Sequence, residues 1–216
     1  GIFMAANGAA ATAENNSTVR ASTGENVRLG GGGDLEVIAE NTTAQNAQAT
    51  GITAGGLALG ATVATASSNT RTEAVVGQGL RVDTAMGQLQ VVADGQDANR
   101  AHSIAGTGGL ISGSASVATT DAGSRVNALL GNQAGQGSAI NAADVIVHAS
   151  QASGYAGQAD STSASLAGAS GAAVINRVDS HVDAAIGDGA VLWAGKSVSV
   201  RADNQFNSLL DGAAVD

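Results

Sequence analysis

The amino-acid sequence repeats itself about every 54 residues, and this repeat constrains the fold more than any other feature. The run Val198-x-Val200-x-Ala202 has three earlier counterparts, and the final alanines of the four copies stand at positions 39, 93, 149 and 202. A second run, Val182-x-Ala184-x-Ile186, also occurs four times, and a glycine directly follows each copy. We therefore predict one repeat domain over residues 1–216, made of four copies of a 53–56-residue unit.

Both runs alternate with a period of two, which indicates β-strand rather than helix. Stacking the copies gives uniform apolar columns on one face and mixed, mostly polar columns on the other, as expected for an inner and a solvent-facing side. The alternative for the Ala-rich segments is helix, but their Gly, Thr, Ser and Val content favours strand. The three inward columns are Leu35/Leu89/Val145/Val198, Val37/Val91/Val147/Val200 and Ala39/Ala93/Ala149/Ala202.

The pattern leaves the size of the coil open, because two periods fit. A third segment in each unit is anchored by Leu57, Leu110 and Leu166, and it divides the unit into steps of about 18 residues. This favours an all-β fold, a parallel β-solenoid of about 18-residue coils in a 54-residue superperiod, which we call the narrow coil. The alternative is a wide coil of about 54 residues with three long sides. Turns are expected where Gly clusters with Asn or Asp, including Gly30–Asp34, Asp94–Gly95 and Gly187–Gly189.

Composition supports a thin, extensively paired sheet structure. Aromatic residues make up only 2% of the chain, so the interior must be filled by Ala, Val, Leu and Ile. Proline is absent, which suits strands that are paired on both sides, because proline cannot donate to a ladder. The opening residues 1–4 already lie within the pattern, and we therefore expect the chain to be a fragment of a longer array.

The charge pattern excludes several classes of partner. The formal net charge is −9, and nine Lys and Arg residues are spread singly along the chain. Binding to nucleic acid requires clustered cations, so no nucleic-acid partner is expected. No apolar run approaches the length of a membrane span, so no membrane insertion is expected. The chain has no cysteine, which excludes disulfides and thiolate metal sites.

No residue set carries a recognisable chemistry. His102, His148 and His181 are isolated in the sequence, and a metal site would require further ligands in matched columns. Asp179–Asp183 contains the residue types of a nucleophilic triad, but neighbours on a strand point to opposite faces. Gly30–Leu35 is only faintly similar to a calcium-binding nonapeptide. We therefore predict no catalytic, cofactor or metal site, no cofactor, and no enzymatic activity.

The unit seen most cleanly at 182–202 resembles the repeat regions of large secreted bacterial surface proteins. These are the filamentous-haemagglutinin-like and leukotoxin-like adhesins of two-partner secretion or autotransporter systems. The resemblance implies an extracellular or cell-surface location and a structural role, as a solenoid shaft that serves as spacer or fibre body in adhesion or matrix. Expected partners are neighbouring repeats or identical chains stacked along the axis. The alternatives are a binding module that recognises a host or matrix glycan or a receptor through its outer face, and a toxin passenger segment.

Overall fold

The computed structural model describes residues 3–131 and 137–210, and all its regular structure is β-strand. No helix is present in these residues, so the prediction of strand for the Ala-rich segments is confirmed. Within the same residues there is also no helix that could cross a membrane. The strands are β1 (Met4–Asn15), β2 (Thr18–Ser22), β3 (Arg28–Leu29), β4 (Leu35–Ser68), β5 (Arg71–Val76), β6 (Arg81–Val82), β7 (Met86–Ala122), β8 (Arg125–Leu130), β9 (Ala139–Val178), β10 (His181–Ile186) and β11 (Val191–Ser208).

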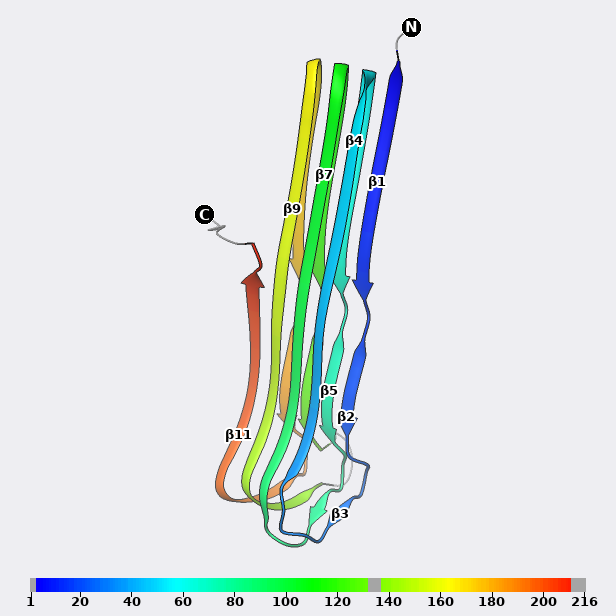
Figure 1. Cartoon of the computed structure of the whole chain (residues 1–216). Helices are drawn as coiled ribbons and strands as arrows, with labels where there is room; N and C mark the ends of the chain where they lie inside the picture. The colour runs from blue at the N-terminus through cyan, green and yellow to red at the C-terminus, as the bar shows by residue number, and fades with distance from the viewer. Residues whose placement is uncertain (1–2, 132–136, 211–216) are drawn as a thin grey trace.

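Each long strand runs the length of the molecule, folds back at one end and returns behind itself (Figure 1). In β4 the fold lies near Gly55 and Gly56, because β1 pairs only with Leu57–Ser68, the second half of the strand. We call the first half of each long strand the outgoing arm, the second half the returning arm, and the fold between them the tip. The short strands β2, β5, β8 and β10 continue the returning arms as a second sheet.

All strand pairs are parallel, and each unit lies directly beside the next. Leu35 pairs with Leu89, which lies 54 positions later, and Leu89 pairs with Val145. The narrow coil, which the sequence favours, is therefore wrong, because no two paired strands in the described residues are separated by only one step of the narrow coil. The longer repeat of the wide coil matches the register, but the unit has two long arms rather than three long sides.

The three leucines used to divide the unit into thirds do not anchor a third inward strand. Leu110 and Leu166 lie at the tip, where they are 62% and 88% exposed. Leu57 is half-buried at the start of a returning arm. The spacing between these leucines and the inward columns thus reflects the distance along an arm to the tip, and not the length of a coil.

The predicted inward columns are confirmed at the end of the molecule opposite the tip. Val37, Leu89, Val91, Val145 and Val147 are buried there with Ala39, Ala93 and Ala149, whereas Ala202 of the last unit is exposed. Residues of the second run pack against them from the other sheet, among them Ala74, Val76, Val126, Ala128 and Leu130. In the last unit, Val198 and Val200 of β11 are 48% and 46% exposed, because β11 is an edge strand in the described structure.

The interior becomes thinner toward the tip, where alanine is the main buried apolar residue. Ala47, Ala49, Ala64, Ala66, Ala101 and Ala118 form a separate cluster. The two arms approach so closely that a Cβ added at Gly51 would lie 2.9 Å from Thr62 Cγ2. At the tip itself, a Cβ added at Gly109 would lie 2.0 Å from the carbonyl oxygen of Gly55. The tips of two successive units can therefore stack only because position 109 has no side chain.

The predicted turns have different outcomes. Gly187–Gly189 does lie between two strands, and Gly189 has a φ of 73°, which glycine adopts without strain. Gly30–Asp34 also lies outside the strands. The predicted turn at Asp94–Gly95 is wrong, because both residues lie within β7. Gly95 instead makes room for the buried side chain of Gln151, whose Oε1 would lie 2.1 Å from an added Cβ.

Candidate functional site

A layer of buried polar side chains separates the two apolar clusters, and Asp97 of β7 lies at its centre. Asp97 is 4% exposed and has no ion-pair partner in the part of the chain that the structure describes. Its carboxylate accepts hydrogen bonds from Thr43 Oγ1 at 2.6 Å and from Gln151 Nε2 at 2.8 Å, both on outgoing arms. On the returning side, Ser124 donates a third bond, and Thr70 Oγ1 lies 3.3 Å from Asp97 Oδ2.

These contacts join three successive units through one side chain, and they reach the residues that directly precede β5 and β8. Other polar pairs extend the layer on either side: Asn41 with Ser17, and Ser153 with Ser180 at 3.0 Å. Asn99 donates to Ser68 Oγ at 2.8 Å, although its own Oδ1 accepts no hydrogen bond from any residue that the structure describes. Because the donors converge on a carboxylate that solvent hardly reaches, the arrangement ties the outgoing arms to the segments that lead into β5 and β8.

The sequence reasoning missed Asp97 as a special residue, although a signal was present. Inward positions on the outgoing arm alternate, so Ala93 facing inward places positions 95 and 97 inward as well. An acidic side chain at an inward position of an arm whose other inward residues are uncharged is the feature that marks it.

The three histidines lie apart from one another on the outside. His102 Nε2 is 3.4 Å from Asp160 Oδ2, and His148 Nε2 is 3.0 Å from Asp203 Oδ2, in each case on the adjacent strand. Hydrogen bonds from Arg201 and then from His148 lower the pKa of Asp203. His181 is exposed.

The two motifs considered in the sequence do not form sites in the described residues. Ser180 Oγ bonds the inward Ser153, whereas His181 is exposed, so the two side chains do not converge. In the Gly30–Leu35 segment, the Oδ1 of Asp34 accepts the backbone N–H of Gln88 at 2.7 Å. That carboxylate therefore ties one unit to the next.

We expect added calcium or a chelator to change the melting temperature by less than about 2 °C, because a ligand that binds only the folded state would raise it. Within residues 3–131 and 137–210 there is no group of three His, Cys, Asp or Glu side chains that could hold a metal ion. Thermal unfolding followed by circular dichroism, with and without calcium, measures the shift. An increase of many degrees would reveal a metal site.

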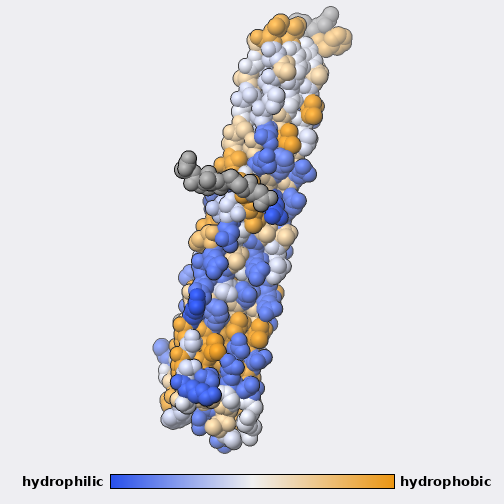
Figure 2. Space-filling view, turned by 60° about the vertical axis from the view of Figure 1, so that its left-hand side comes forward, coloured by the Kyte–Doolittle hydropathy of each residue, from blue (hydrophilic) through white to orange (hydrophobic). Residues whose placement is uncertain are grey.

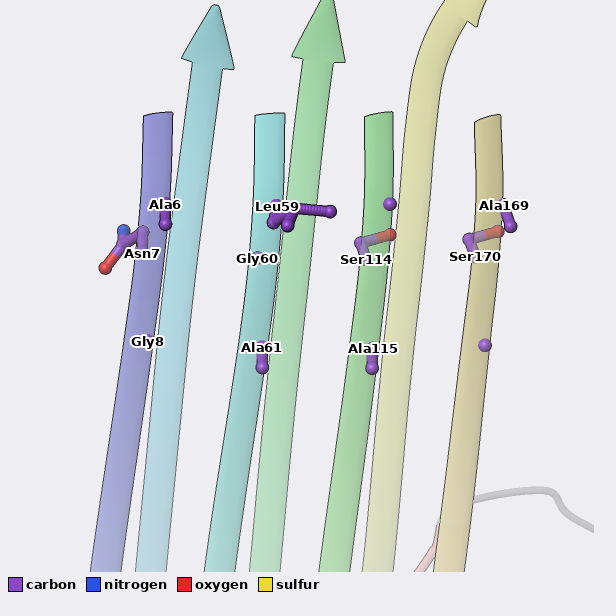
Figure 3. A pocket seen from close by; sticks show the side chains of 12 residues that line it. Ala6, Asn7, Gly8, Leu59, Gly60, Ala61, Ser114, Ala115, Ala169 and Ser170 are labelled. Atoms are coloured by element: carbon purple, nitrogen blue, oxygen red, sulfur yellow. The ribbon is translucent and has the colours of Figure 1, made fainter. Parts of the chain in front are cut away.

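A shallow hollow of about 670 Å³ lies on the outer face of the returning arms, close to the tip (Figure 3). Small residues in register across four strands form its floor: Gly8, Ala61, Ala115 and Gly171. Leu59 is the large side chain of the row above, and it leans toward Gly113, where an added Cβ would lie 3.3 Å from its Cδ2. The hollow contains no charged group and offers mainly a smooth apolar surface.

The stack has open strand edges on both of its sides. On one side, the outgoing arm of β4 has no further partner among the described residues, whereas its returning arm pairs with β1. On the other side, the outgoing arm of β9 pairs with β11, and its returning arm, 167–178, pairs only with β7 in the part of the chain that is described. Each edge can accept another parallel strand.

No known protein family matches this sequence, and comparisons with curated proteins and with solved structures likewise gave no match.

Proposed function

We propose that the chain is a β-solenoid segment with a structural role, serving as a spacer or fibre body of an extracellular bacterial adhesin or matrix protein. The observation that supports this is the unbroken parallel ladder through successive units, with the same apolar residues stacked in register from unit to unit. Such an array grows by adding units, and each unit depends mainly on its neighbours.

The proposed mechanism is mechanical. At a strand spacing of ~4.8 Å, four units occupy only ~19 Å along the stacking direction, whereas an arm of about 20 residues extends roughly 65 Å across it. Repetition therefore gives a ribbon whose length is set by the number of units. Further repeats, or identical chains, are the partners that fit the open strand edges, and the surface location follows from the resemblance to secreted adhesins.

The test compares the chain with a tandem duplication of residues 1–216. We expect small-angle scattering to show that the duplicated chain is wider by about 19 Å in one dimension only, and that it unfolds in one transition at a higher temperature. Two independently unfolding bodies joined by a flexible link would contradict the continuous solenoid. The location is tested separately, by labelling intact bacteria with an antibody against the chain, where labelling only after permeabilisation would contradict it.

A further inference from the structure

The outer face of the returning arms carries no charged residue over the half nearest the tip. The segments that form it are 4–13, 57–66, 111–120 and 167–176, and none contains Asp, Glu, Lys, Arg or His. We call this surface the charge-free face. On the side away from the tip, the charge-free face ends at the row of laterally paired residues that contains Glu14, Asp121 and Arg177.

The charge-free face also exposes large apolar side chains. Met4 is 75% exposed, Ile111 56%, Leu59 53% and Val63 42%, and all four point outward from neighbouring strands. The side of the molecule shown in Figure 2 is likewise mostly white and orange at the tip, and its strongly hydrophilic side chains begin farther from the tip. On a chain with a net charge of −9, the lack of any charge over this area is unusual.

The size of the face is close to what an interface requires. Ten residues at roughly 3.3 Å each and four strands at ~4.8 Å give a surface of about 600 Å². Stable complexes bury about 800 Å² on each partner, while contiguous apolar patches of a few hundred Å² or more on a monomer mark interaction sites.

From this area and its lack of charge, we infer that the charge-free face packs against the same face of a second copy of this chain. A two-fold interface requires a surface that is complementary to itself. This face meets that requirement, because the hollow over Ala61 and Ala115 lies beside the protruding Leu59 and Ile111. The leucine and isoleucine of each copy enter the hollow of the other, and two sheets pack face to face through small side chains.

This pairing differs from the axial stacking under the proposed function, because it uses a sheet face and stops at two copies. The chain has no cysteine, so a single introduced thiol reports the contact cleanly. In the full chain, Ala115→Cys should be joined into a dimer by a short bifunctional thiol reagent, whereas Glu36→Cys, on the outer face of an outgoing arm, should not. Axial stacking separates equivalent residues of two chains by about 19 Å, which is beyond the reach of a short reagent.

The second measurement is sedimentation equilibrium of the full chain. We expect a dimer, and Leu59→Asp should weaken it at least about tenfold, because the pairing would bury an unpaired carboxylate. Ile38→Asp is the matched control, since Ile38 is 41% exposed and lies outside the face. It should leave the dimer unchanged, and circular dichroism verifies folding of both variants.

A monomer at high concentration, or equal effects of the two variants, would overturn the inference. So would a monomer that binds neutral phosphatidylcholine vesicles through Leu59, which would assign the face to a lipid surface.

Discussion

Replacing Ala149 by phenylalanine should lower the free energy of unfolding by about 3 kcal/mol or more, because the interior has no room for a ring. Ala149 is fully buried and pairs with Ala93 on one side and Ala202 on the other. The adjacent strands are only ~4.8 Å away, and closely packed interiors move aside at a high cost. Urea denaturation of the two proteins gives the difference directly.

The control for this experiment is the neighbouring residue on the opposite face. His148 points outward, and its hydrogen bond to Asp203 is a partly exposed pair worth at most about 1 kcal/mol. His148→Phe should therefore cost much less than Ala149→Phe. Equal losses in the two variants would mean that the inward and outward faces are assigned incorrectly.

The inner columns could be predicted because each keeps an aliphatic residue of similar size through successive units. Alanine recurs at 39, 93 and 149, and in the structure these three side chains are 1%, 0% and 0% exposed. A slip of one residue would have exchanged this column with the mixed one beside it, so the pattern itself determines the register.

The width of the unit could not be predicted in the same way, because alternation reports which face a residue occupies and not which strand lies beside it. The glycine-rich segment around Leu110 has an apolar residue at about the expected spacing, and this spacing favours the narrow coil. In the structure the glycines allow the chain to fold back at the tip, where Gly109 approaches the carbonyl oxygen of Gly55, and Leu110 points into solvent. The two coil sizes are distinguished only by which strands pair, as in the pairing of Leu35 with Leu89.

Asp97 provides the second test of the interior, because two large effects oppose each other there. A buried carboxylate without a cation is costly, and replacing buried charges by neutral residues often stabilises a protein. Against this, the carboxylate satisfies Thr43, Ser124 and Gln151, and a buried donor that loses its acceptor costs about 1–3 kcal/mol. Thr70 has an alternative acceptor in Ser124 Oγ at 3.1 Å, and Gln151 has one in Ser153 Oγ at 3.2 Å.

We expect the hydrogen bonds to dominate, so that Asp97→Ala lowers the free energy of unfolding by about 3 kcal/mol. Asp97→Ser is the matched variant, because the same inward column carries Thr43 in the preceding unit and Ser153 in the following one. A serine hydroxyl can accept a bond from Thr43 or Gln151, so this variant should lose less than half as much stability. Urea denaturation measures both variants. If Asp97→Ala is as stable as the parent protein, desolvation of the carboxylate outweighs its four contacts, and the polar layer does not stabilise the packing of the outgoing arms against the returning side.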